Sequence, residues 1–202
     1  MLRLRLLVLM IFFGCVGSGN RMLILVPQKS YSDYMQEYNS CTGKGMISSN
    51  GPLKGKLSFT FKSQRDSTFF QFGDAIGRKA LLMWITPSTV TARNLIENKQ
   101  YDYDEIMQFF PFLKIMEPND ITEFIWGVEP SYKEKFKTVD KSITKNIELN
   151  FRSEQLDNEK RALVEARFGD KESRQFVSIN VQNRNRNSEY VNMKKVWKLL
   201  KY

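Results

Sequence analysis

Histidine is absent from the 202 residues of this chain. Its absence argues against Ser–His triads, Cys–His dyads and most zinc sites, because each of these needs an imidazole as base or ligand. A glycine-rich phosphate-binding loop is also missing, since the spacing of Gly43, Gly45 and Gly51 fits no such motif. The acids Asp102 and Asp104 lie beside an expected helix start, where a solvated role is typical. We therefore expect no enzymatic activity, no metal site and no cofactor.

Cysteine is scarce, with Cys15 and Cys41 as its two occurrences. Two cysteines do not make a disulfide framework. Cys15 ends an N-terminal segment in which two arginines precede an apolar run, Leu6–Phe13. That run is too short to cross a bilayer, which takes roughly 20 apolar residues. Its basic start and the small Gly14 that follows are typical of a secretory signal peptide.

The dipeptide Gly14-Cys15 resembles a bacterial lipobox, in which the cysteine is lipidated and becomes the first mature residue. We therefore predict a signal peptide over residues 1–14, lipidation of Cys15 and a tether over 15–29. Val16 is not the aspartate that retains some lipoproteins in the inner membrane, which favours lipid anchoring in the outer membrane of a bacterial cell envelope. An ordinary cleaved signal and an uncleaved N-terminal anchor remain as alternatives.

The formal net charge is +9, with 42% hydrophobic and 26% charged residues. This composition is that of a globular protein, and its basic balance could favour anionic lipid headgroups or nucleic acid. Lysine and arginine are spread along the expected strands, however, and the densest group, residues 183–187, is predicted to be a polar hairpin loop. Export to the envelope argues against a nucleic-acid partner, and we predict none.

Apolar alternation of period two dominates most of the chain and indicates β-strands. The predicted strands cover residues 43–49, 55–63, 67–72, 79–85, 89–94, 143–151, 162–168 and 174–181, with a last strand ending near Trp197. Asn50-Gly51 predicts a tight turn between the first two strands. The strand over 79–85 is apolar on both faces and therefore needs cover on each side.

Helical spacing interrupts this pattern in three places. Helices are predicted from Ser30 to about Asn39, from Asp102 through a kink at Pro111, and from Pro118 to Gly127. Short consecutive strands with tight turns imply antiparallel pairing. We predict one domain over residues 30–202, of mainly β (α+β) class, in which a curved antiparallel sheet forms an unclosed barrel lidded by short helices inserted mid-chain.

Short motifs in a consistent order resemble the outer-membrane lipoprotein-receptor family LolB, which is related in fold to the periplasmic carrier LolA. The motifs are Gly45-Met46-Ile47-Ser48, Phe59-Thr60-Phe61, Ile76-Gly77, Tyr101-Asp102-Tyr103-Asp104-Glu105, Pro111, Ile125-Trp126-Gly127-Val128-Glu129-Pro130 and Val196-Trp197. The chain departs from the family pattern at Phe61, where tryptophan is usual, and at Asp74-Ala75, where asparagine and proline are common. Between residues 130 and 197 it matches only in strand pattern.

The resemblance implies an apolar cavity that takes the acyl chains of lipoproteins from a LolA-like carrier and helps to insert them into the membrane. The candidate cavity residues are Ile47, Phe59, Phe61, Phe70, Phe72, Leu81, Met83, Phe110, Leu113, Phe124 and Trp126. The alternative for each of them is a place in a solid core.

Ile76 and Gly77 align with the family's membrane-insertion loop, on which an exposed apolar residue pushes cargo into the bilayer. The alternative is that Ile76 folds under the loop as part of the core. The resemblance further implies a monomer that meets the membrane through its lipid anchor. A second possible function is a non-transport envelope lipoprotein that acts as a structural or ligand-binding scaffold.

Overall fold

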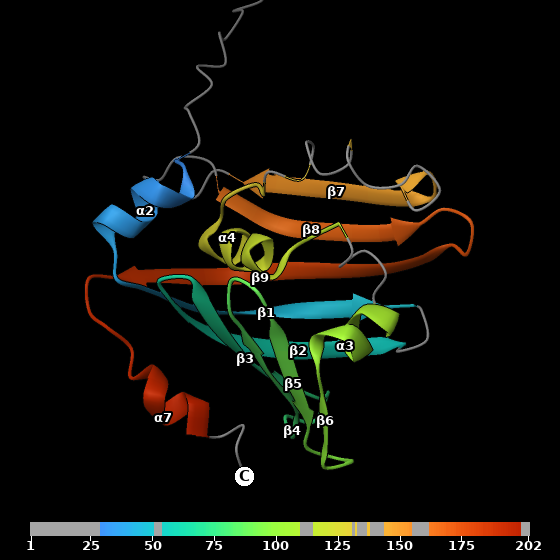
Figure 1. The fold of residues 1–202 in the computed structure, drawn as a ribbon, viewed down its shortest axis with the longest axis horizontal. Coiled ribbons are helices and arrows are strands. Elements are labelled where there is room, and N and C mark those ends of the chain that lie inside the picture. The colour runs from blue at the N-terminus through green and yellow to red at the C-terminus, as the bar shows by residue number, and fades with distance from the viewer. Residues whose placement is uncertain are drawn as a thin grey trace, which may run out of the picture.

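The computed structural model describes residues 29–50, 54–109, 115–130, 132, 137, 144–154 and 162–198. In this part of the chain one antiparallel sheet of nine strands has the order β6-β5-β4-β3-β2-β1-β9-β8-β7 (Figure 1). The strands are β1 (Ser40–Ser49), β2 (Gly55–Gln64), β3 (Ser67–Gly73), β4 (Lys79–Ile85), β5 (Val90–Asn94), β6 (Lys99–Tyr101), β7 (Ile147–Glu154), β8 (Ala162–Asp170) and β9 (Gln175–Asn187). The helices are α2 (Tyr31–Glu37), α3 (Tyr103–Phe109), α4 (Pro118–Trp126) and α7 (Met193–Trp197).

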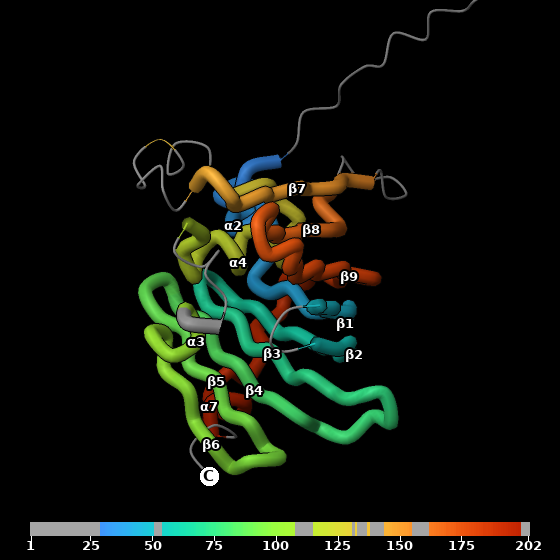
Figure 2. The backbone as a smooth tube through the Cα atoms, turned by 90° about the vertical axis from the view of Figure 1, so that its right-hand side faces the viewer, coloured from blue at the N-terminus to red at the C-terminus, as the bar shows by residue number. Residues whose placement is uncertain are grey.

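The sheet is strongly curved and does not close, because β6 and β7 form its two ends. Figure 2 shows the strands following a bend from β7 through β1 to β6, with α2, α3 and α4 on the same side. This arrangement confirms the predicted fold class, a curved antiparallel sheet with short helices.

Local sequence explains where the helices begin and end. The Ser30 hydroxyl accepts a hydrogen bond from the backbone N–H of Asp33, whose carboxylate accepts one from the N–H of Ser30, so α2 starts in a capping box. The predicted pair Asp102 and Glu105 does the same at the start of α3. Gly127 ends α4 in the left-handed region at φ 92°, as its sequence position predicted.

Several predicted boundaries are wrong. Residues 183–187 are not a hairpin loop but the end of β9, which pairs with β1 as far as Asn187. The segment before Trp197 is the helix α7 and not a strand, because Met193, Val196 and Trp197 follow helical spacing. The short strand β6 was not predicted. The strand predicted over 143–151 begins only at Ile147, as β7. Pro111 lies outside the described residues.

The core has two parts, one on each face of β3 and β4. The larger cluster lies on the concave, helix-bearing face. The smaller one joins Phe69, Leu82 and Trp84 to Val196 of α7, and the rings of Trp84 and Trp197 meet edge to face at 4.7 Å. The cover that β4 needed on its second face is therefore α7.

Cys41 on β1 faces the larger cluster and has no exposed surface. Its Sγ lies 3.9 Å from the carbonyl oxygen of Ile125 in α4. The thiol is thus buried between sheet and helix. No helix in the described ranges combines the length and the apolar character needed to span a membrane.

We predict that Trp197→Ala lowers the free energy of unfolding by about 2–3 kcal/mol, because it strips the outer face of β4 of a large apolar contact. Urea unfolding followed by circular dichroism measures the change. Lys194→Ala on the exposed side of the same helix is the control and should stay within about 0.5 kcal/mol of wild type. Equal effects from the two substitutions would contradict this account of α7.

Candidate functional site

Two rows of apolar side chains cross the concave face in register. Leu81, Phe72 and Phe59 align across β4, β3 and β2, and Met83, Phe70 and Phe61 form the next row. The four phenylalanine rings contact one another, with centroid separations from 5.5 Å between Phe59 and Phe70 to 6.3 Å between Phe59 and Phe61. Aromatic pairs at these separations contribute favourable ring contacts beyond simple burial.

Gly43 and Gly45 on β1 make room for these rings. A Cβ atom on Gly43 would lie 2.6 Å from Cζ of Phe61, and one on Gly45 would lie 2.4 Å from Cζ of Phe59. The rings therefore cross directly over the backbone of β1, where no side chain larger than hydrogen fits. The pairing of β1 with β9 shifts between Lys44 and Gly45, and such bulges bend a sheet. The same two glycines therefore make room for the aromatic rings and lie at the bend of the sheet.

Helix α4 closes one end of the concave face. Ile125 and Trp126 have no exposed surface, and Phe124 is almost as deeply buried. The indole N–H of Trp126 donates a 2.8 Å hydrogen bond to the hydroxyl of Ser63. That hydroxyl also accepts a hydrogen bond from Thr68, whose own oxygen lies 3.1 Å from the hydroxyl of Thr122. Each of these buried polar groups, the indole N–H and the three hydroxyls, therefore has a hydrogen-bond partner, as burial requires.

Tyr31 of α2 covers Trp126 from outside, with the two rings edge to face at 6.0 Å. Its hydroxyl donates to the carbonyl of Arg65 at 2.5 Å. Burial raises the pKa of Tyr31 well above its usual value, so the phenol stays a neutral donor. Helix α2 is thereby joined both to α4 and to the turn between β2 and β3.

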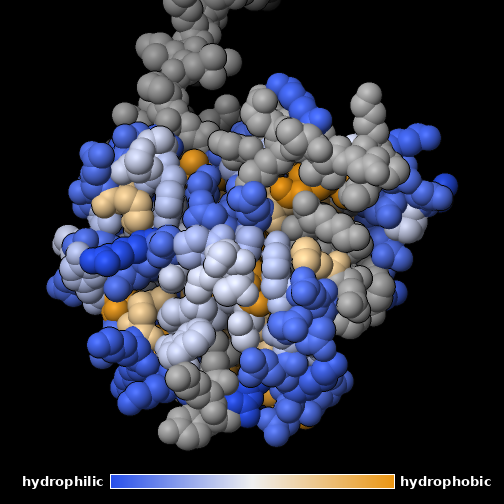
Figure 3. Space-filling view, in the orientation of Figure 1, coloured by the Kyte–Doolittle hydropathy of each residue, from blue (hydrophilic) through white to orange (hydrophobic). Residues whose placement is uncertain are grey.

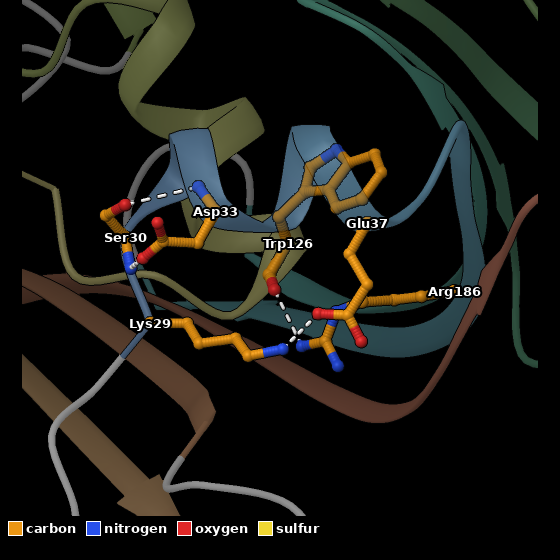
Figure 4. A network of polar contacts seen from close by, with 6 residues as sticks. All are labelled: Lys29, Ser30, Asp33, Glu37, Trp126 and Arg186. Carbon is orange, nitrogen blue, oxygen red and sulfur yellow. Dashed lines mark hydrogen bonds and ion pairs between the residues drawn. The ribbon is translucent and has the colours of Figure 1, made fainter.

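Arg184 and Arg186 of β9 hold the end of α4 against the sheet. Arg184 donates to the carbonyls of Ile125 (2.6 Å) and Phe124 (3.1 Å), and also to that of Leu163 on β8. Arg186 donates to the carbonyl of Trp126 at 2.8 Å (Figure 4). A helix leaves its last carbonyls without intrahelical partners, and a cation near this end also suits the helix dipole. The predicted loop of basic residues is therefore a strand that caps α4.

Arg186 also links α2 to this arrangement. Its guanidinium lies 4.1 Å from the ring centroid of Tyr34, the buried residue of α2. Beside it, Lys29 pairs with Glu37 at the other end of the same helix (Figure 4). The Lys29 ammonium lowers the pKa of the Glu37 carboxyl, which keeps this exposed pair charged at neutral pH.

The other end of the concave face is less completely covered. Leu57, Ile47 and Ile179 align across β2, β1 and β9, and all three are only partly buried. Helix α3 brings the partly buried side chains of Tyr103 and Met107 to the same cluster. Figure 3 views the helix-bearing side and shows hydrophobic side chains between hydrophilic ones on it. The face therefore runs from a tightly buried end under α4 to an end with accessible apolar surface.

The candidate cavity residues come together on this face. Phe59, Phe61, Phe70, Phe72, Phe124 and Trp126 are buried in the larger cluster, and Ile47, Leu81 and Met83 pack against it. Phe110 and Leu113 lie outside the described residues, as does Cys15. Sequence reasoning missed Leu57, Ile179, Arg184 and Arg186. The alternation of arginine with asparagine over 183–187 was a period-two signal that could have identified the last two.

The β3–β4 turn carries Ile76, which is 75% exposed. Asp74 organises this turn, because its carboxylate accepts hydrogen bonds from the backbone N–H groups of Ile76 (3.1 Å) and Arg78 (2.9 Å) and from the Arg78 side chain (2.8 Å). The Arg78 guanidinium and these N–H groups lower the pKa of Asp74. The carboxylate thus supports the turn above its unfolded pKa and stops doing so only as the pH falls through the lower, folded value.

Gly77, the residue after Ile76, has φ 81° with open space around its Cα, so the turn uses a conformation that favours glycine. Among the described residues no group of three or more histidine, cysteine or acidic side chains could hold a metal ion.

Comparison with known proteins supports the fold. No family model and no curated protein matches the chain. Among solved structures, the chain is similar to a DUF1329 family protein from Desulfovibrio piger, with a TM-score of 0.52 and 13% sequence identity. The match covers 83% of this chain and 94% of that one. At this identity the similarity extends to the fold alone.

We predict that Arg184→Met lowers the free energy of unfolding by about 2–4 kcal/mol, because it leaves carbonyls at the end of α4 and on β8 without their charged donor. Arg174→Met, in the exposed turn before β9, is the control and should have little effect. Hydrogen exchange should show faster opening of α4 in Arg184→Met. Unchanged protection of α4 would contradict the capping role.

Proposed function

We propose that this protein binds acyl chains on the accessible end of its concave face and passes them to a membrane, as a lipid-anchored envelope protein of LolB-like type. The observation that carries this proposal is the gradient of burial along one continuous apolar face. Under α4 the side chains of Ile125 and Trp126 are fully buried, whereas Leu57, Ile47 and Ile179, toward the other end of β2, β1 and β9, are only partly buried. That end is where a flexible hydrocarbon chain can be received.

The chemistry of acyl chains makes such a face useful. Each buried methylene contributes about 0.8 kcal/mol, so one acyl chain binds a membrane reversibly and a second chain makes the anchoring of a lipidated protein stable. Spontaneous transfer through water is therefore very slow, and a receptor must offer a comparable apolar surface. Methionine and aromatic side chains such as Met83, Met107 and Tyr103 adapt to flexible apolar ligands.

The remaining parts of the proposal come from the sequence. Lipidation of Cys15 would anchor the protein in the outer membrane, and a LolA-like carrier would supply lipidated cargo. The exposed Ile76, held on an ordered turn, would then promote release into the bilayer. These assignments extend the resemblance to LolB and agree with an apolar residue that faces solvent at 75% exposure.

The alternative is an envelope scaffold with a solid interior. The mutual ring contacts of Phe59, Phe70 and Phe72 favour it, because that half of the face is already filled by side chains. The two functions differ in whether the accessible end takes up a hydrocarbon ligand.

We predict that the full chain binds an anthroyloxy-labelled palmitate saturably and that unlabelled palmitate displaces it. Ile47→Trp should weaken this binding about tenfold or more, because a bulky ring would occupy the accessible end of the face. Met46→Trp is the matched control, since the neighbouring residue of β1 points to the opposite face and is 38% exposed. Fluorescence titration measures both variants.

Both variants retain residues 1–28, so probe bound by the N-terminal apolar segment cancels in the comparison. Equal affinities for Ile47→Trp and Met46→Trp would place the ligand elsewhere. Absence of saturable binding in the wild type would favour the scaffold.

We predict that Ile76→Glu leaves the unfolding midpoint unchanged but slows transfer of a bound triacylated lipoprotein to phospholipid vesicles by about tenfold or more, because a carboxylate resists entry into the bilayer interface. Flotation of the vesicles and quantification of the lipoprotein measure the transfer. Ser88→Glu, in the exposed turn between β4 and β5 at the opposite end of these strands, is the control. Transfer at the wild-type rate in Ile76→Glu would remove the proposed role of this residue.

A further inference from the structure

A second isoleucine is nearly as exposed as Ile76. Ile96, in the turn between β5 and β6, is 71% exposed. The exposed large hydrophobic residues of the described chain are Met46, Ile76, Ile96 and Tyr190, and the two isoleucines expose the largest fractions. Exposing an aliphatic side chain of this size to water is unfavourable in free energy, and here two such side chains lie on neighbouring turns.

The two turns lie next to each other at one end of the sheet. The β3–β4 turn starts after the pair Gly73 and Lys79, and the β5–β6 turn starts after the pair Asn94 and Lys99. The backbone N–H of Leu95 donates to the carbonyl of Ala80 at 2.9 Å, which places the second turn beside the first residues of β4. Figure 2 shows both turns projecting from the same lower end of the sheet.

The same hydrogen-bonding device presents both isoleucines. The side-chain oxygen of Asp74 accepts the N–H of Ile76 (3.1 Å), and that of Asn94 accepts the N–H of Ile96 (2.9 Å), in each case two residues along the chain. Asn94 also accepts the N–H of Glu97 at 3.1 Å. Side-chain oxygens that bond to the backbone in this way fix the shape of a turn. Each isoleucine therefore stands on an ordered backbone rather than on a loose loop.

Basic residues surround the two turns. Arg78 and Lys79 follow Ile76, Lys99 follows Ile96, and all three are exposed. Lys56 on β2 is also exposed and lies just beyond Ser58, the partner of Gly73. Asp74 pairs with Arg78, Glu97 bonds to Asn94 and Tyr101, and Lys99 lies 3.6 Å from Glu105, so Lys79 and Lys56 supply most of the excess positive charge here. Ile76 and Ile96, the apolar tips of the two turns, thus lie near cationic side chains. This combination complements a bilayer whose headgroups are anionic.

We propose that the β3–β4 and β5–β6 turns form one contact surface for an anionic phospholipid bilayer, with Ile76 and Ile96 inserting together and the lysine and arginine side chains lying at headgroup level. This inference rests on the proposed function and extends it by a second inserting residue and by the lipid class. It also gives the molecule a fixed orientation, because two neighbouring points on one rigid sheet restrain its tilt more than one point does.

The test places a fluorescent side chain at each tip of the full-length chain. Ile76→Trp, Ile96→Trp and the control Ser88→Trp are each mixed with vesicles of phosphatidylcholine and phosphatidylglycerol in equal amounts, with brominated or unbrominated acyl chains. Bromine quenches tryptophan that reaches the acyl region, and subtraction of the wild-type signal removes the contribution of Trp84, Trp126 and Trp197. We expect at least about twofold more quenching at positions 76 and 96 than at position 88.

Two further arms test the lipid class and the coupling of the tips. Vesicles of phosphatidylcholine alone should reduce quenching at both tips, since the cations then lose their anionic partners. Adding Ile76→Glu to Ile96→Trp should roughly halve the quenching at position 96 if the two tips insert as one surface.

Quenching at position 76 alone, or at neither tip, would overturn the inference. So would a dimer that forms through these turns in wild type and is lost in Ile96→Glu, because the tips would then serve a second copy of the chain. Palmitate binding is measured on the same variants. If the variants bind palmitate but their tryptophans are not quenched, the membrane-contact inference fails and the proposed acyl-chain function stands. If the wild type does not bind palmitate, the acyl-chain function fails independently.

Discussion

The capping of α4 by Arg184 and Arg186 is the interaction on which the rest of this architecture depends. A helix of nine residues is marginal by itself, and its stability must come from its contacts. Trp126 and Ile125 supply apolar burial, but the carbonyls at that end of the helix would be left without partners beneath the sheet. Two arginines on β9 satisfy them, so the strand that joins β1 to β8 also fixes the helix that covers the sheet.

Curvature follows from a second constraint, the close approach of aromatic rings to β1. Gly43 and Gly45 allow Phe61 and Phe59 to lie over the strand, and the shift in pairing beside Gly45 bends the sheet around them. The bend concentrates apolar side chains on the concave face, but the short helices cover that face unequally. In the described residues, the proposal of a ligand therefore rests on the unequal burial of the two ends of this face. It does not rest on a cluster of polar side chains.

Much of this fold is predictable from sequence, because local signals and tertiary packing agree there. The strand over 79–85 has the predicted bounds, and the Gly127 stop and the Asp102 start are where capping chemistry places them. The prediction failed where a long-range partner decides the outcome. Asn183 to Asn187 look like a polar loop until the carbonyls of α4 give the arginines a reason to point inward. Likewise, the prediction missed that Val196 and Trp197 of α7 pack on Trp84, a contact between residues far apart in the sequence.

The candidate site divides in the same way. Alternation identified the phenylalanines of β2 and β3, since residues two apart in a strand share a face. The partly exposed row of Leu57 and Ile179 depends on register between distant strands, which one strand's pattern does not encode. The predicted strand ends at Asn94 and gives Ile96 no role, because the exposure of Ile96 depends on the turn that the Asn94 side chain sets.

The position of Cys41 has a consequence for redox chemistry. Thiol–disulfide exchange requires a sulfur that a thiolate can approach, and the sulfur of Cys41 is enclosed between β1 and α4. Once the chain has folded, oxidants and foreign thiols can reach this sulfur only when that helix separates from the strand. The rate of thiol modification at Cys41 in the native protein therefore measures how often α4 separates from β1.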